Sequence, residues 1–139
     1  MALLALAALV ARAVDNDSVR DNFMKFGYAI IPLVMGSHMG HNLFHLLAEG
    51  KSIYYTAIGL GGGVVPGGST ALVSTGTLVA LQFVLIALGA LASLYAAYRI
   101  ARSNYGSRAW AAFAPYAVLI VLLTAASVWL LRFPMAMRM

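Results

Sequence analysis

Apolar residues dominate this chain, and polar clusters divide them into long runs. Four runs stand out, at residues 1–14, 23–48, 78–101 and 109–131. A helix rises about 1.5 Å per residue, so each of the last three runs is long enough for a hydrocarbon core of about 30 Å. The pattern therefore predicts three full transmembrane helices and a shorter membrane helix at the N-terminus.

The stretches between the runs differ in character. Residues 15–22 form a polar linker, where Asp21 or Asn22 is expected to cap the helix that follows. Residues 51–77 form the longest connection, and their glycine-rich centre predicts a loop. Residues 103–107 are a short turn, so the last two helices should run antiparallel. The pattern thus predicts a helical bundle with one long connecting loop, over residues 51–77.

Two residues modify the second run, which extends over residues 23–48. Pro32 lies inside it and predicts a kink, because proline lacks the backbone N–H and crowds the preceding turn. Gly50 follows it as a natural stop for a helix. The run is therefore expected to be one kinked helix that ends near Glu49.

Composition supports a membrane protein. Of the 139 residues, 63% are hydrophobic and 9% are charged, whereas a soluble domain has about 25% charged residues. The predicted class is an all-α integral membrane bundle, with residues 1–139 forming a single membrane domain in contact with the lipid bilayer. The chain has no cysteine, which excludes an iron–sulfur cluster ligated by cysteines of this chain.

The basic residues are unevenly distributed between the two predicted sides of the bundle. The net charge of +5 is spread over the ends of the runs, which is typical of membrane orientation and does not indicate nucleic-acid binding. The positive-inside rule places the richer side in the cytoplasm, with the Gly-rich loop and the C-terminus outside. One side carries Arg12, Arg20, Lys25, Arg99, Arg102 and Arg108, and the other carries Lys51, Arg132 and Arg138.

All three histidines lie in the second half of the second run, and the only glutamate, Glu49, follows directly after it. A helix turns about 100° per residue, so His38, Asn42, His45 and Glu49 fall on one stripe, with His41 beside it. Histidine is rare inside a membrane and usually faces protein, cofactor or water. This stripe is the candidate functional site of the chain.

The opposite face of the same run is suited to packing. Gly36 and Gly40 are four residues apart and provide a smooth surface for a second helix. On the later runs Gln82, Thr124 and Ser127 are expected to serve as hydrogen-bond partners between helices rather than as site residues.

Four interpretations of the stripe remain open. It could be a hydrogen-bonded network that joins helices. His38, His41, Asn42 and His45 could instead bind haem b, with a partner chain supplying a second axial ligand, or a quinone or quinol whose protons Glu49 accepts. His38, His41 and His45 could also bind a metal ion. Of these, His41 and His45 are one helical turn apart and could share an ion, but two ligands are only half of such a site.

The sequence around the stripe resembles the C-terminal membrane region of bacterial membrane-bound polyferredoxins, which are ferredoxin-type quinol dehydrogenase components. The cysteine-rich cluster domain of that family is absent from this chain. The resemblance is carried by Phe26-Gly27-Tyr28-Ala29-Ile30-Ile31-Pro32-Leu33, by Gly36 and His38, by His41-Asn42-Leu43-Phe44-His45-Leu46-Leu47-Ala48-Glu49-Gly50, and by Phe133-Pro134-Met135-Ala136-Met137-Arg138.

The resemblance implies electron transfer between membrane quinol and iron–sulfur or haem carriers. Its match extends to His38, His41, Asn42, His45 and Glu49. The leading hypothesis is a subunit of a quinol-linked oxidoreductase complex in the bacterial inner membrane, partnered by other membrane and redox subunits. Two alternatives are a structural anchor for a redox partner and a transition-metal ion transporter.

Overall fold

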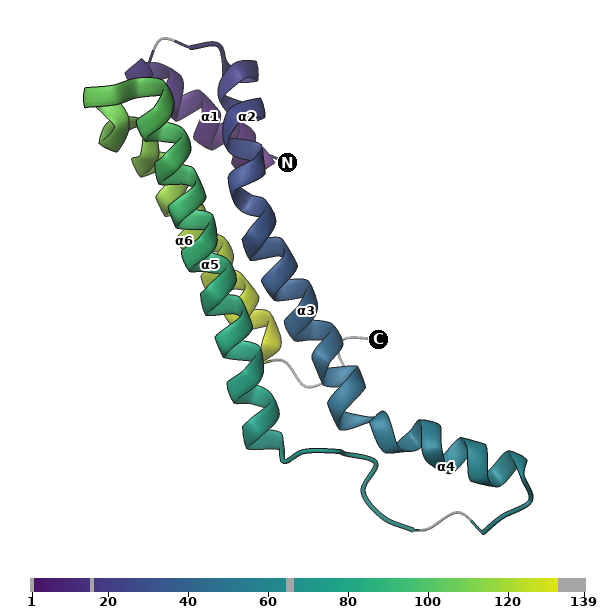
Figure 1. Cartoon of the computed structure of the whole chain (residues 1–139). Helices are drawn as coiled ribbons and strands as arrows, with labels where there is room; N and C mark the ends of the chain where they lie inside the picture. The colour runs from purple at the N-terminus through teal and green to yellow at the C-terminus, as the bar shows by residue number, and fades with distance from the viewer. Residues whose placement is uncertain (1, 16, 65–66, 133–139) are drawn as a thin grey trace.

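The computed structural model describes residues 2–15, 17–64 and 67–132, and every regular element among them is helical (Figure 1). The prediction of an all-α fold is confirmed. In chain order the elements are α1 (Ala2–Asp15), α2 (Val19–Gly27), the 3₁₀ turn η1 (Tyr28–Ile30), α3 (Ile31–Ala48), α4 (Gly50–Leu60), α5 (Thr75–Tyr105), the 3₁₀ turn η2 (Gly106–Arg108) and α6 (Ala109–Leu131).

The long helices form an elongated bundle with α5 as its common neighbour. Helices α3 and α6 both pack along α5, while α1 packs against α6 and α2 at one end of the bundle (Figure 1). At the opposite end α4 turns away from the bundle. The α5–α6 hairpin confirms the predicted antiparallel pair, and its turn requires Gly106, whose φ of 51° is unfavourable for residues with a side chain.

The interior of the bundle is made largely of small residues. Ala97, Ala101 and Ala112 are fully buried and allow close approach of the helix backbones, and Ile86 and Ile120 fill the wider spaces. Large apolar side chains lie mostly on the outside, among them Leu88, Leu91, Val121 and Leu122, each more than half exposed. Much of the outer surface of the long helices is therefore apolar.

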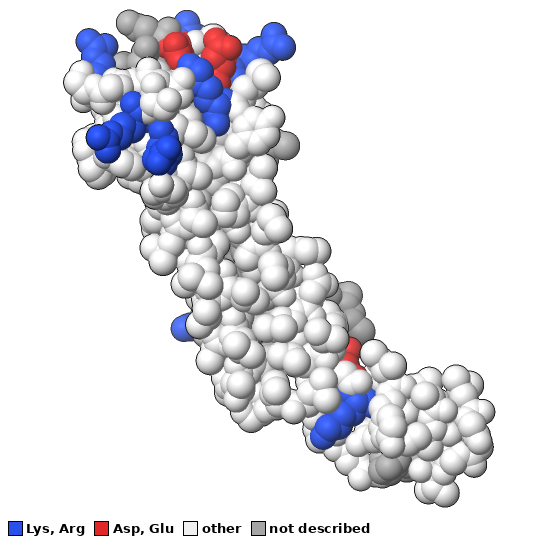
Figure 2. Space-filling view, in the orientation of Figure 1, with Lys and Arg blue, Asp and Glu red and all other residues white. Residues whose placement is uncertain are grey.

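The end of the bundle formed by α1, α2 and η2 gathers most of the charges (Figure 2). It carries the six basic residues that the sequence assigns to one side, whereas Arg138 lies outside the described residues. Lys25 Nζ lies 2.6 Å from Asp17 Oδ2, and the Tyr105 hydroxyl lies 2.8 Å from the same oxygen. The hydrogen bond from Lys25, then that from Tyr105, lowers the pKa of the Asp17 carboxyl below its ordinary value.

A stack of aromatic rings lies directly beneath this ion pair. Phe26 is fully buried, with its ring centroid 3.9 Å from that of Tyr116 and 6.3 Å from that of Tyr105. The Tyr105 hydroxyl also lies 2.7 Å from Oδ1 of the buried Asn22. The polar groups of α2 are thus satisfied by residues of the linker and α5.

The second apolar run begins earlier than expected. Helix α2 starts at Val19, and its N-cap is Ser18, whose hydroxyl accepts a hydrogen bond from the Asp21 N–H at 3.1 Å. The prediction that Asp21 or Asn22 caps the helix is wrong, because Ser18 stands three residues ahead and satisfies a free N–H of the first turn. Asn22 is instead buried against Tyr105.

The regular helix is interrupted just before Pro32, the residue at which the sequence predicted a kink. The α-helical pattern changes to the 3₁₀ turn η1 just before it, and α3 begins with Pro32 in its first turn. The next N–H, that of Leu33, donates to the hydroxyl of buried Ser93 on α5 at 2.9 Å. The interruption is therefore held in place by a bond between helices.

The connection predicted as a loop over residues 51–77 contains a helix, α4, and that part of the prediction is wrong. Residues 51–60 contain only one glycine, Gly59, and they lie within α4. The glycine cluster lies beyond α4 and starts at Gly61, and the described residues 61–64 and 67–74 form no helix. The prediction missed α4 because it judged residues 51–77 by their total glycine content, although most of the glycines follow α4.

Candidate functional site

The glycine face of α3 packs against α5, as the sequence predicted. A Cβ on Gly36 would lie 2.5 Å from the Leu85 carbonyl oxygen, and Gly89 approaches the same point from α5. Gly40 is also buried but leaves ordinary van der Waals space, 3.6 Å from the Gln82 carbonyl oxygen. This contact fixes the rotation of α3, and with it the direction of the opposite face.

Polar bonds hold α3 in that rotation. The buried Gln82 side chain donates through Nε2 to the Gly40 carbonyl at 2.9 Å, and the hydroxyls of Ser37 and Ser127 lie 3.1 Å apart. The predicted interhelical roles of Gln82 and Ser127 are confirmed. Thr124 differs, because its hydroxyl donates to the Ile120 carbonyl of its own helix at 2.7 Å.

The predicted stripe lies on the outer surface of the bundle. His38, Asn42, His45 and Glu49 are all exposed, and His41 beside them is half-buried. None of the hydrogen bonds or ring contacts found for these side chains in the described part of the chain reaches another helix. We call these five residues the polar face of α3.

Contacts within the polar face join some of its members. His45 Nδ1 lies 3.4 Å from Glu49 Oε2, and the rings of His41 and His45 meet edge to face with centroids 5.3 Å apart. The Asn42 amide donates to the His38 backbone carbonyl at 3.0 Å, so it leaves the His38 ring without a side-chain partner in this set. His41, His45 and Glu49 thus form one group, and His38 lies farther along the helix.

Metal ligation by the chain alone gains no support from this arrangement. Within the described ranges, no group of three or more His, Asp, Glu or Cys residues is placed to hold a metal ion. The two neighbouring imidazoles, His41 and His45, are one turn apart and face each other edge to face. The described residues therefore offer at most the two neighbouring imidazoles, which are fewer ligands than a metal site needs.

The outer end of the polar face is fixed by the chain returning from α4. Leu72 N–H donates to the Leu47 carbonyl at 2.7 Å, and the Thr70 hydroxyl donates to the Ala48 carbonyl at 3.2 Å. Lys51 N–H in turn donates to the Thr70 carbonyl at 3.0 Å. These bonds satisfy carbonyls that the end of α3 would leave free, and they hold Glu49 at the bend between α3 and α4.

The sequence predicted that this helix ends near Glu49, and α3 does end at Ala48, but the second helix that starts at Gly50 was not predicted. A side chain at position 50 would collide with Leu72 of the returning segment. Figure 1 shows α4 extending on the side of α3 away from α5. The polar face also points away from α5, because it lies opposite the glycine face that packs on α5. The pair His45–Glu49 therefore lies near the inner corner between the two helices.

Among the described residues, one helical stretch, Thr75–Leu131, is long and apolar enough to cross a membrane. It comprises α5, η2 and α6. Helix α3 is also mostly apolar, but its histidines and Asn42 reduce its hydropathy.

Comparison with known proteins finds no matching family model, no similar curated protein and no similar solved structure.

Proposed function

We propose that this chain is a membrane subunit of a bacterial electron-transfer complex and that the polar face of α3 borders a quinol site shared with a partner subunit. The observation that carries the proposal is the exposed row of imidazoles on a helix whose other face is locked into the bundle. Histidine in such surroundings is costly unless a ligand, water or another protein covers it.

The distribution of charge supports a membrane location. No Lys, Arg, Asp or Glu occurs in residues 26–48, 75–98 or 109–131, and a helix of that length spans about 35 Å. Only 28% of the most apolar window of Thr75–Leu131 is buried within the chain, whereas the core helix of a soluble protein is mostly buried. The proposal is that α2–α3, α5 and α6 each cross the membrane, because each charge-free stretch is long enough for a hydrocarbon core of about 30 Å.

The asymmetry of basic residues supports an orientation. The end with Arg12, Arg20, Lys25, Arg99, Arg102 and Arg108 would face the bacterial cytoplasm by the positive-inside rule. Glu49, α4 and the Gly-rich segment would then lie at the outer surface of the inner membrane.

The pair His45–Glu49 supplies chemistry that suits a quinol. The imidazole can accept a hydrogen bond from a quinol hydroxyl and can take up the proton that the hydroxyl loses. Oxidation of a quinol releases two electrons and two protons. In this proposal His45 and Glu49 take the protons toward the surface, while a haem or iron–sulfur carrier of the partner subunit takes the electrons.

Haem b is the competing occupant of the same face. A haem with two histidine ligands needs imidazoles on both sides of the ring. The histidines of this chain lie on one helix only, so a partner helix would have to supply the second ligand.

The test is quinone binding by the detergent-purified full chain, with and without its membrane partners. A short-chain quinone should bind, and His45→Gln and Glu49→Gln should each weaken binding about tenfold, the value of one lost hydrogen bond to a charged or strongly polar group. Asn104→Ala is the matched control, since Asn104 is exposed at the opposite end and bonds only to the Ile100 carbonyl of its own helix in the described structure.

Two results would overturn the quinol proposal. One is quinone binding that is unchanged in both variants. The other is a stoichiometric haem b spectrum that disappears when His38, His41 or His45 is replaced by alanine, which would assign the face to haem.

A further inference from the structure

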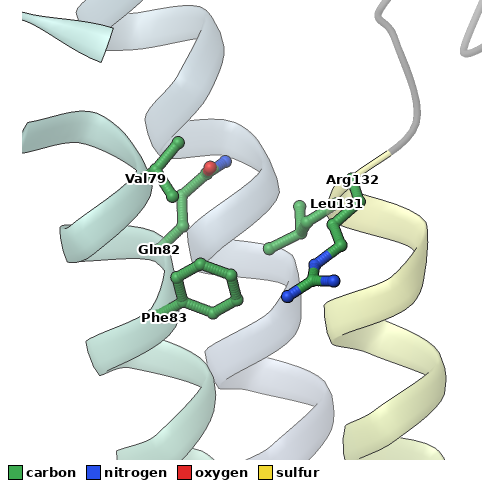
Figure 3. A pocket seen from close by; sticks show the side chains of 5 residues that line it. All are labelled: Val79, Gln82, Phe83, Leu131 and Arg132. Atoms are coloured by element: carbon green, nitrogen blue, oxygen red, sulfur yellow. The ribbon is translucent and has the colours of Figure 1, made fainter. Parts of the chain in front are cut away.

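The bundle has a cavity of about 320 Å³ where α6 ends. Its walls come from α5 and from the last residues of α6, namely Val79, Gln82, Phe83, Leu131 and Arg132 (Figure 3). Helix α6 stops at this level, while α5 continues to Thr75 and α3 continues to Ala48. The cavity thus lies between α5 and the last described residues of α6.

Arg132 gives this cavity its chemical character. Its guanidinium points toward the space in front of Phe83 in Figure 3. The two ion pairs found among the described residues are Lys25–Asp17 and His45–Glu49, so neither uses Arg132. An arginine at a helix C-terminus is favourable by itself, but here it also borders the cavity, and none of the described residues that line the cavity is a carboxylate.

The rest of the lining is apolar or already engaged. Val79, Phe83 and Leu131 present hydrocarbon, and the Gln82 amide donates to the Gly40 carbonyl. Trp129 and Leu130, which precede Arg132, are exposed by 62% and 58%. A ligand of this cavity therefore meets one positive charge and otherwise apolar walls that continue onto the apolar surface of α6.

We propose that this cavity binds the phosphate group of an anionic phospholipid, with Arg132 as the contact to the phosphate and with an acyl chain along α6. A phosphodiester carries one negative charge, which matches one arginine, and Arg pairs with phosphate through two parallel hydrogen bonds. Free inorganic phosphate has the same chemistry but gains nothing from the apolar walls. The proposal rests on the proposed membrane location and is independent of the polar face of α3.

The test uses the full chain purified in a mild detergent and native mass spectrometry to count bound lipid. The probes are dioctanoyl phosphatidylglycerol, dioctanoyl phosphatidylcholine and inorganic phosphate. We expect one phosphatidylglycerol to bind more tightly than phosphatidylcholine, whose choline cation would lie near Arg132. Inorganic phosphate should not displace the lipid at equal concentration.

Two variants separate the charge from the cavity. Arg132→Gln should weaken phosphatidylglycerol binding tenfold to hundredfold, as expected for loss of a charge-assisted contact. Val79→Trp keeps the charge but fills the cavity, and it should weaken binding to a similar extent. Arg20→Gln is the matched control, because it removes the same charge from an exposed position at the other end of the bundle.

Several outcomes would overturn the proposal. Equal loss in Arg132→Gln and Arg20→Gln would indicate unspecific charge attraction, and full binding in Val79→Trp would separate the lipid from the cavity. Displacement by an equal concentration of phosphate would indicate a free anion as the ligand. If the chain is recovered without detergent and does not associate with membranes, the membrane location itself fails, and that result is distinguishable from the others.

Discussion

The two ends of the bundle differ in whether their polar side chains bond to other elements of the chain. At the α1–α2 end, Asp17, Asn22 and Lys25 meet Tyr105 above the buried ring of Phe26. At the α4 end, the polar face of α3 is exposed and its side-chain contacts stay within one helix. Both ends belong to the same long helices, so the difference arises from which faces the packing covers.

This contrast separates structural from functional polarity. A polar group that finds its partner inside the chain stabilises the fold and offers nothing to a ligand. A polar group held on an exposed face, as on α3, contributes little to the stability of the fold and stays available to a ligand. The α1–α2 end is thus expected to control stability, and the polar face is expected to control binding.

The largest expected effect is at the aromatic stack. Phe26→Ala should lower the free energy of unfolding by about 3–5 kcal/mol, because it empties a fully buried site between Tyr105 and Tyr116. Denaturant titration in detergent, followed by helical circular dichroism, measures it. Met24→Ala, on the exposed side of the same helix, should change little. Equal effects of the two changes would mean that the stack is not the anchor of this end.

The next effect compares two glycines of α3. Gly36→Ala should destabilise the protein by about 1–3 kcal/mol, because its Cβ would collide with the Leu85 carbonyl. Gly40→Ala should be neutral or stabilising, since its Cβ has ordinary space and alanine favours the helix by about 0.5–1 kcal/mol. Thermal unfolding of the matched pair measures the difference, and the same loss in both would contradict the observed packing of α3 on α5.

A smaller effect concerns acid. Because the folded protein lowers the pKa of Asp17 from its ordinary value of 3.8, ionised Asp17 adds stability above that value. This contribution should disappear as the pH falls through the lowered pKa. Unfolding midpoints measured from pH 7 down to pH 2 should therefore decline less steeply in Asp17→Asn than in the unaltered chain. Parallel curves would show that the Lys25 contact does not stabilise the folded state.

The smallest effect on stability is expected on the polar face itself. His45→Gln and Asn42→Ala should change the free energy of unfolding by less than about 0.5 kcal/mol, because both side chains are exposed and bond only within α3. Calorimetry of the purified protein measures this. If either variant lost as much unfolding free energy as Gly36→Ala, the polar face would stabilise the fold in the same way as the α1–α2 end does.

Much of the fold was predictable because its signals are local. Charge-free apolar runs predict long helices, and the spacing of Gly36 and Gly40 predicts the packed side of α3. The same spacing places His38, Asn42, His45 and Glu49 on the other side. Helical geometry alone sets this division, and it needs no knowledge of the neighbouring helix.

Other features depend on residues distant in the chain. The partner of Leu33 N–H is Ser93, and the end of α3 is capped by Thr70 and Leu72. The cavity at Arg132 exists because α6 ends at the level of Gln82, a relation that no single run of sequence contains. These features could not be predicted because contacts between distant segments depend on how the helices are aligned in space.

The sequence by itself determined that the chain is helical and which side of α3 carries imidazoles, since both follow from the period of one helix. Only the tertiary structure decided that this side faces outward, that Glu49 lies at a fixed bend and that Arg132 borders a cavity. The physical reason is that periodicity defines a face, whereas packing against other helices decides what that face meets.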